Sequence, residues 1–248
     1  MPELERISIE AYRGFYGPLA LAVGGGYAMR VPEAPASPLV NRVVGLGLSE
    51  PATEDGLDAA LAAMGGTAVY VAVSPSARPP ELAVWLSARG FEPGWGWMLF
   101  ERGPEHPPVV ESGVELAEVG PERAEAFGRI VAAGYGLPEA TVPFVAALAG
   151  NGDWTCWLAL DGGEPAAAAL WARGGAVYLG FAATLPEHRG KGALIAARIR
   201  RAGELGCETI VSETGERRDD RPSNSYRNLL RFGFEERYVV PNWLRAAT

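Results

Sequence analysis

One short stretch limits the fold of this chain more than any other: PEHRGKGA, residues 186–193, in which two glycines flank the only lysine of the sequence. The stretch follows AVYLGFAAT (176–184), a run typical of a β-strand. It precedes residues 192–205, whose apolar side chains recur at helical spacing and are followed by a glycine. A strand, a tight glycine loop and a helix are therefore expected in this order.

The expected loop has the chemistry of an anion site. The first N–H groups of a helix have no partners within the helix, and they point into the preceding loop together with the positive end of the helix dipole. Gly190 and Gly192 let the backbone approach a ligand, and Arg189 and Lys191 supply charge that suits phosphate oxygens. The stretch is not a Walker A loop, because glycine follows the lysine where that motif needs serine or threonine. A helix start that merely carries basic residues is the alternative.

The charge balance narrows the class of partner. With 22 basic and 30 acidic residues the net charge is −8, whereas a surface that binds nucleic acid needs a basic excess. A cationic small molecule suits this chain better than a nucleic acid. The two histidines, His106 and His188, lie in no GxSxG or HExxH motif, so we expect neither a hydrolase nor a metal cofactor.

Composition also bears on location and packing. No apolar run approaches the roughly 20 residues that a membrane helix needs, and the first residues lack the pattern of a secretion signal. We therefore expect a cytoplasmic protein without a membrane partner. Cys156 and Cys207 stand apart, without CxxC spacing, and are expected to be buried thiols. The seven tryptophans are expected to pack in the core rather than to line a cation site.

Residues 105–113, rich in proline, glycine and charge, indicate a linker between a first domain at 1–104 and a second at 114–248. In the second domain the patterns predict a strand, two helices, three strands joined as hairpins, a helix, a strand, a helix and a closing strand. The predicted fold class is therefore mixed α/β, with a mostly antiparallel sheet flanked by helices.

This order and the motif within it resemble the GNAT (Gcn5-related) N-acetyltransferases over residues 114–240. In that family a strand leads into R-x-x-G-x-G/A and a helix, and SNSYRNLLRFGF (223–234) resembles a later helix of the family. The resemblance implies that the loop binds the pyrophosphate of acetyl-CoA, that the preceding strand pairs with the pantetheine arm, and that the thioester enters a splay between the family's fourth and fifth strands. It places coenzyme contacts at Ala182, Ala183, Thr184, Arg189, Gly190, Lys191, Gly192, Ala193, Leu194 and Asn224.

The chain departs from the family pattern at several positions. Leu194 stands where the motif ends in Gly or Ala. The tyrosine that often protonates the departing thiolate is replaced by Leu229, so Tyr226, one turn earlier, is the candidate acid. Simple packing of Tyr226 within its helix is the other interpretation. Asn224 suits a pantetheine contact or a helix cap equally well.

The chemistry also needs a base, because an ammonium cannot attack a thioester until it loses a proton. The strand at 176–184 contains no carboxylate where the family usually has a glutamate, and Glu213 on the next strand is the best candidate. Alternation puts Glu213 on the same face as Val211, where partial desolvation would strengthen the base. A solvated Glu213, with a water chain as the base, is the alternative. The tetrahedral oxyanion is expected to bind a backbone N–H.

The first half of the chain repeats the element order around PEHRGKGA, in the residues from 45 to 93, and both copies end in Gly-Phe-Glu. When Pro51 is aligned with Pro186, Glu54 and Asp55 fall where the basic loop would hold a pyrophosphate, and Glu50 is nearby. We therefore predict a helix at 54–64 that begins with its own acidic residues, in a degenerate copy without coenzyme.

The sequence thus predicts a tandem GNAT-like protein with two mixed-sheet domains. Its second domain would transfer an acetyl group from acetyl-CoA to an amine of a small molecule. The alternative is a non-catalytic acyl-CoA-binding or regulatory module, favoured by the missing tyrosine and the missing strand carboxylate. A third interpretation is a phosphate-anchoring fold that acts on another nucleotide.

Overall fold

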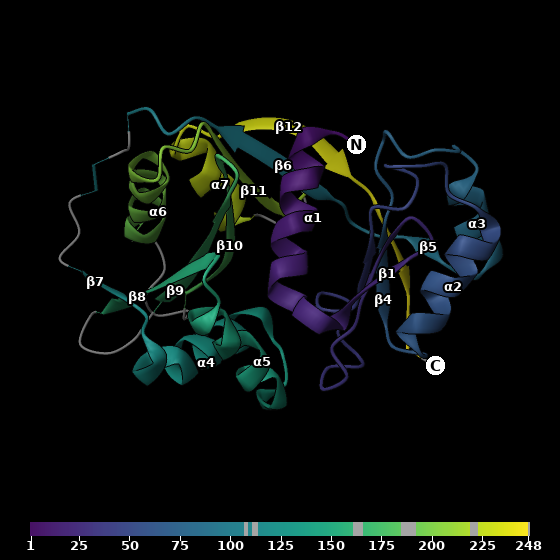
Figure 1. The fold of residues 1–248 in the computed structure, drawn as a ribbon, viewed down its shortest axis with the longest axis horizontal. Coiled ribbons are helices and arrows are strands. Elements are labelled where there is room, and N and C mark those ends of the chain that lie inside the picture. Colours follow the sequence, from purple (N-terminus) through teal and green to yellow (C-terminus); the bar gives the residue numbers. More distant parts are fainter. Residues whose placement is uncertain (107–108, 111–113, 161–165, 185–191, 219–222, 248) are drawn as a thin grey trace. The chain divides into compact units, whose positions relative to one another are not determined.

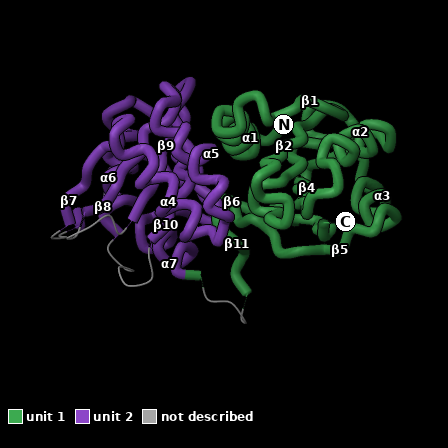
Figure 2. The backbone as a smooth tube through the Cα atoms, turned by 90° about the horizontal axis from the view of Figure 1, so that it is seen from below, with its two compact units in different colours: residues 1–99, 214–223, 237–248 green, residues 100–213, 224–236 purple. Residues whose placement is uncertain are grey.

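The computed structural model describes residues 1–106, 109–110, 114–160, 166–184, 192–218 and 223–247. The chain folds into two compact units, each with its own β-sheet (Figure 2). The first unit consists of residues 1–99, 214–223 and 237–248, and the second of residues 100–213 and 224–236.

The first unit contains a six-stranded mixed sheet. The strand order is β1 (Ala20–Val23), β2 (Gly26–Met29), β3 (Arg42–Val44), β4 (Val69–Ala72), β13 (Asn242–Arg245) and β5 (Glu92–Pro93). β3 and β4 run parallel, whereas the other neighbours in this sheet are antiparallel. Its helices are α1 (Glu3–Tyr16), α2 (Glu54–Met64) and α3 (Leu82–Ala88), and a short 3-10 turn lies at Gly17–Leu19.

Helix α2 packs its apolar face into the core of the first unit. Its buried residues recur three or four positions apart: Leu57, Ala60, Leu61 and Met64. The helix begins after the N-cap Thr53 and ends at Gly65, which has the left-handed conformation that glycine adopts without a steric penalty. The helix predicted at 54–64 is thus confirmed at the same bounds.

The second unit is built on a seven-stranded sheet with the order β12-β6-β11-β10-β9-β8-β7. Along the chain its elements are β6 (Trp97–Arg102), β7 (Glu115–Glu118), α4 (Ala124–Tyr135), α5 (Val142–Ala146), β8 (Trp154–Leu160), β9 (Ala166–Arg173), β10 (Ala176–Thr184), α6 (Ala193–Glu204), β11 (Thr209–Gly215), α7 (Asn224–Arg231) and β12 (Glu235–Val240). Short 3-10 turns lie at Pro121–Arg123, Glu139–Thr141 and Ala147–Gly150. From β7 to β12 this is the predicted order, and the mixed α/β fold class is confirmed.

Helices α4 and α6 cover opposite faces of the second sheet (Figure 1). Gly134 of α4 lies against Ala183, whose partner across the β9–β10 pair is Ala167. Leu194 of α6 packs against Ala166, the preceding residue of β9. Because successive side chains of a strand point to opposite faces, the two helices lie on opposite sides of the sheet.

The two units exchange strands. β13, the last strand of the chain, lies between β4 and β5 of the first sheet, where Trp243 is opposite both Val71 and Pro93. β6, which precedes the predicted linker, lies between β12 and β11 of the second sheet. The sequence predicts continuous domains at 1–104 and 114–248, whereas each compact unit takes a strand from the other part of the chain. An interior strand needs partners on both edges, and β13 provides them to β4 and β5.

The cysteines and several tryptophans are buried, as the sequence predicts. Both thiols are free. Burial, with the Glu118 carboxylate nearby, raises the pKa of Cys156 to about 12, so this thiol stays protonated at neutral pH. Trp154, Trp157 and Trp171 pack in the core of the second unit. None of the helices in the described ranges has the length and apolar character that a membrane span requires.

Candidate functional site

β10 and β11 form a parallel pair that opens at one end. Their paired residues end at Leu179 and Ser212, while the strands themselves continue to Thr184 and Gly215. At the last pair the Ser212 hydroxyl donates a hydrogen bond of 3.1 Å to the Leu179 carbonyl oxygen. The strands therefore separate beyond this pair, which is the splay that the sequence predicts.

A β-bulge lies beside the splay, on the other edge of β10. Gly180 pairs with Ala169 and Ala183 with Ala167, so two residues of β10 oppose one residue of β9. Phe181, within the bulge, has a φ of +51°, which is uncommon for a residue that carries a side chain. Bulges interrupt the hydrogen-bond ladder and occur often beside active sites.

Close packing holds the bulge in place. The Phe181 ring meets Trp154 edge to face, with 5.4 Å between the ring centroids. Gly134 of α4 lies so near the strand that a methyl group there would be 2.5 Å from the Ala183 Cβ. Of the predicted pantetheine contacts, Ala182 is exposed, Ala183 is buried and Thr184 is half-buried. An extended ligand can therefore reach the backbone of this segment at Ala182.

Helix α6 begins at a glycine that is required on two grounds. Gly192 has a φ of +50°, and a Cβ there would lie 2.6 Å from the Phe232 ring. It has no side chain to cap the helix, and the first turn contains no acidic residue. Ala193 is buried, and Leu194 packs against Val114, Ala159 and Ala166, so the helix start presents backbone N–H groups rather than these side chains.

The charged part of the predicted anion loop cannot be placed. Arg189, Gly190 and Lys191 lie outside the described residues. Their contribution to an anion site stays a prediction from the sequence, whereas Gly192 and the first turn of α6 are described.

Glu213 is the first residue of β11 beyond the last pair with β10, so it lies at the opening of the splay. Ile210, Val211 and Ser212 before it are buried, and Glu213 itself is half-buried. Alternation along the strand puts Glu213 on the face of Val211, as expected from the sequence. A half-buried carboxylate at this opening can accept a proton from an amine that enters it.

The other two candidate residues lie on α7 and make local contacts. Tyr226 is buried, its ring meets Phe100 edge to face at 4.9 Å, and its hydroxyl donates a hydrogen bond to the Glu236 carboxylate. These contacts agree with a packed tyrosine, and its role as an acid stays a prediction. Asn224, the first residue of α7, is exposed and accepts a hydrogen bond of 2.6 Å from Arg227 Nη2. Its pantetheine contact likewise stays a prediction.

Sequence reasoning missed Arg198, whose side chain reaches the bulge. Its Nη1 donates hydrogen bonds to the carbonyl oxygens of Ala169 at 3.2 Å and Gly180 at 3.3 Å. A signal was available, because residue 198 lies three positions after Ile195 and directly before Ile199 in the apolar stripe of α6. An arginine in such a stripe is buried unless the helix turns its face outward.

The corresponding place in the first unit is filled by the chain itself. β3 and β4 are the parallel pair there, and they pair at Val43 and Val71. Beyond β3, the Arg78 N–H donates to the Gly47 carbonyl at 3.0 Å, and the Arg78 carbonyl accepts from the Ala52 N–H at 2.7 Å. Backbone groups that a pantetheine arm would need are thus already paired.

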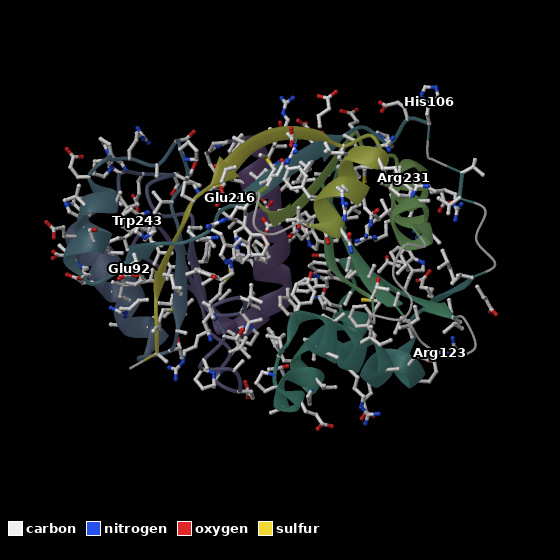
Figure 3. All side chains as sticks on the ribbon, turned by 180° about the vertical axis from the view of Figure 1, so that it is seen from behind. Glu92, His106, Arg123, Glu216, Arg231 and Trp243 are labelled. Atoms are coloured by element: carbon white, nitrogen blue, oxygen red, sulfur yellow. The ribbon has the colours of Figure 1, made fainter. Side chains whose placement is uncertain are left out.

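A separate pocket of about 430 Å³ lies elsewhere in the second unit. Glu208, one of its lining residues, directly precedes β11, so the pocket lies at the opposite end of that strand from the splay. Arg102 in its wall donates to the backbone carbonyls of Gly103, Phe232 and Glu105. His106, also in its wall, points outward from its loop (Figure 3). Within the described ranges, no group of three or more acidic, histidine or cysteine side chains is placed to hold a metal ion.

Comparison with solved structures shows the fold. A GCN5-related N-acetyltransferase from Kribbella flavida matches with a TM-score of 0.66 over 100% of this chain and 97% of its own, at 20% sequence identity. One from Sphaerobacter thermophilus gives a TM-score of 0.62 over 90% of this chain and 76% of its own, at 12% identity. A tandem GNAT protein from the clavulanic acid biosynthesis pathway gives 0.54 over 79% of this chain and 68% of its own, at 15% identity.

These matches establish that the chain has the fold of the GCN5-related N-acetyltransferases, in a tandem arrangement. No family model and no curated protein matches the sequence. At identities this low the likeness concerns the fold, and activity has to be argued from the site itself.

Proposed function

We propose that the second unit transfers an acetyl group from acetyl-CoA to an amine of a small molecule. The observation that carries this proposal is the parallel pair β10–β11, which separates after Leu179 and Ser212 directly beside the bulge of β10. Such an opening lets a thioester lie between two strands, with exposed backbone on one side and a carboxylate, Glu213, on the other. The fold comparisons support the same class of reaction.

The coenzyme would lie along β10 and end at α6. Its pyrophosphate would accept hydrogen bonds from the first N–H groups of α6, at Ala193 and Leu194, and from the loop that contains Arg189, Gly190 and Lys191. Its pantetheine arm would pair with the backbone from Ala182 to Thr184, and Asn224 would be a further contact. Gly192, directly before these N–H groups, brings no side chain of its own to the helix start.

The reaction would proceed by direct attack. Glu213 would take a proton from the substrate ammonium, directly or through water, and the amine nitrogen would form a bond to the thioester carbon. A backbone N–H at the bulge would stabilise the oxyanion. Collapse of this intermediate breaks the C–S bond, and the thiolate takes a proton from Tyr226 or from water. The products are the N-acetylated amine and free coenzyme A.

A second candidate function is a non-catalytic acyl-CoA-binding module. The observation that favours it is the α7 helix, where Leu229 is buried at the position of the usual tyrosine and the Tyr226 hydroxyl is already bonded to Glu236. A binding module would hold the coenzyme without any acid to protonate its thiolate.

Two measurements separate these functions. Calorimetric titration with acetyl-CoA tests binding, and release of free thiol in the presence of a panel of amines tests transfer. Binding with thiol release supports the acetyltransferase, and binding without release for every amine supports the module. An absence of binding at millimolar acetyl-CoA would overturn both.

A further inference from the structure

Arg198 is a charged side chain in the interior of the second unit. It lies on the inner face of α6 and is 3% exposed. Its Nε donates to the Leu194 carbonyl of its own helix at 3.0 Å, and its Nη1 donates to carbonyls of two neighbouring strands, at Ala169 of β9 and Gly180 of β10. These two residues face each other at the point where the β9–β10 register begins to shift.

Burial of this guanidinium is costly, so its presence needs an explanation. Burial lowers the pKa of Arg198 to about 10, and the neighbouring phenols of Tyr135 and Tyr178 oppose that shift. The side chain therefore remains protonated at neutral pH and keeps a positive charge buried between helix α6 and the sheet. An apolar residue would fill this place in the α6 stripe at a lower desolvation cost, because a buried charge stabilises a fold poorly. What the arginine adds is its pair of bonds at the bulge.

The direction of the peptide groups shows where these bonds act. The carbonyl of Gly175, directly before β10, accepts a hydrogen bond of 3.0 Å from the Glu208 N–H, so it points toward β11, as does every second carbonyl after it up to Leu179. Carbonyls alternate along a strand, and the Gly180 carbonyl accordingly points toward β9, where Arg198 meets it. The peptide between Gly180 and Phe181 is trans, so its N–H points opposite to its carbonyl. The Phe181 N–H is thus directed to the β11 side, where the splay opens.

We propose that Arg198 is a positioning residue for acyl transfer, which fixes the Gly180–Phe181 peptide so that its N–H is aimed at the thioester oxygen. This inference rests on the proposed function of the second unit. A cation bonded to the Gly180 carbonyl polarises the whole amide, and a polarised amide donates a stronger hydrogen bond from its N–H. Arg198 would act from behind the strand, without touching the substrate.

The test compares Arg198→Met, which keeps length without charge, with Arg198→Lys, which keeps the charge. The matched control is Arg200→Met, because Arg200 is exposed on the same helix. The first readout is the ¹³C NMR shift of acetyl-CoA labelled at its thioester carbonyl, bound in the absence of an amine. In the unmodified protein we expect a downfield shift relative to free acetyl-CoA. It should be largely lost in Arg198→Met, intermediate in Arg198→Lys and retained in Arg200→Met.

The second readout is the kinetics with an amine that is acetylated. For Arg198→Met we expect kcat to fall roughly 10- to 100-fold, with the KM for acetyl-CoA and the Kd of coenzyme A within about twofold, because the lost interaction forms in the transition state. Arg198→Lys should recover part of the rate. An equal loss in both variants, together with weaker coenzyme binding, would indicate a merely structural role and overturn the proposal.

The outcomes are distinct from those of the proposed function. If acetyl-CoA binds and Arg198→Met shows the carbonyl shift of the unmodified protein, the inference about Arg198 is wrong whatever the acceptor. If acetyl-CoA does not bind the unmodified protein, the proposed function fails and this inference fails with it. If Arg198→Met does not fold, Arg198→Gln, which can donate hydrogen bonds without a charge, decides the matter, since an unchanged shift and an unchanged kcat in that variant contradict the proposal.

Discussion

Helix α2 of the first unit and helix α6 of the second each connect the two strands of a parallel pair, yet they begin differently. Thr53 caps α2 by accepting a hydrogen bond of 3.0 Å from the Gly56 N–H, and Glu54 and Asp55 follow in the first turn. Gly192 at the start of α6 has no side chain, and no acidic residue follows it in the first turn. One helix start supplies its own negative groups, whereas the described residues at the start of the other, from Gly192 on, supply none.

The residues around the two helix starts, and those that follow the parallel pairs, also differ. In the first unit Arg89 binds Glu54 at 2.9 Å and Asp58 at 2.5 Å, so two of the three acidic residues of α2 have a cationic partner within the unit, whereas Asp55 adds its charge to the helix start. After the last pair with β3, β4 continues with Ala72, whereas β11 continues with Glu213. The same fold thus has an internally satisfied copy and a copy whose helix start and strand opening suit a ligand.

The largest effect is expected at the carboxylate of the splay. Replacement of Glu213 by Gln should lower kcat roughly 100- to 1,000-fold, because the amide cannot accept the proton of the ammonium. The fall of kcat/KM on the acid side of its pH profile should also disappear, if deprotonation of Glu213 causes that fall. Steady-state thiol release across pH measures both.

Glu208→Gln is the matched control, since Glu208 is exposed just before the same strand. It should leave kcat within about twofold. An unchanged rate and pH profile in Glu213→Gln would show that the base lies elsewhere. Glu213 of β11 would then no longer distinguish the second unit from the first, where Ala72 of β4 has the same place.

The next largest effect is expected at the loop before α6. The double variant Arg189→Ala, Lys191→Ala should raise the Kd of acetyl-CoA about 100-fold, because each charge-assisted hydrogen bond contributes roughly 1.5 kcal/mol or more. Most of the rise in melting temperature caused by acetyl-CoA should be lost with it. Arg173→Ala with Arg200→Ala removes two exposed cations and should keep that rise. Equal loss in both pairs would mean that the loop attracts the coenzyme only through net charge.

Coenzyme stoichiometry tests the comparison directly. Titration calorimetry should give close to one acetyl-CoA per chain, because like charges at Glu54 and Asp55 repel a pyrophosphate by about 1 kcal/mol or more each near a surface. The variant Glu54→Gln, Asp55→Asn should still bind one, since the Thr53 cap and the backbone bonds of Arg78 remain. A stoichiometry near two in either protein would contradict the account of the first unit as a scaffold.

The smallest effect is expected at the cap of α2. Thr53→Ala should lower the free energy of unfolding by about 1 kcal/mol, because the Gly56 N–H loses its acceptor, and it should leave the Kd of acetyl-CoA unchanged. Thr53→Ser keeps the oxygen and should cost little. Denaturant unfolding and calorimetry give the two quantities. Weaker coenzyme binding in Thr53→Ala would indicate that the α2 start contributes to the ligand site after all.

The sequence predicted those features of the fold that depend on residues close together in the chain. The bounds of α2, the start of α6 at Gly192 and the order from β7 to β12 follow from apolar spacing, glycine and proline, all within a few residues. The splay and the place of Glu213 followed from the family resemblance together with alternation along β11. These features depend on neighbours in sequence or on a motif that specifies them.

Features set by distant partners were not predictable. Gly180 is a local signal of the bulge beside Phe181, because an isolated glycine within a strand often marks one, but it does not say how the register with β9 shifts. The place of Arg198 in the apolar stripe of α6 indicates burial, but not that the carbonyls of Ala169 and Gly180, on two distant strands, would accept its hydrogen bonds. The sequence analysis names neither β6 nor β13 as a separate strand, and even a clear strand pattern does not say which sheet the strand joins.

The exchange of β13 has a consequence for the order in which the protein can be made. β5 ends at Pro93 and β13 begins at Asn242, so the ribosome adds 148 residues between these neighbours of one sheet. At 5–20 residues per second that interval is roughly 7 to 30 seconds. During it β4 and β5 wait with unpaired edges for the last strand of the chain. The half that is synthesised first is therefore completed only after the strands of the second sheet have been made, and a chain truncated before Asn242 leaves its N-terminal sheet open.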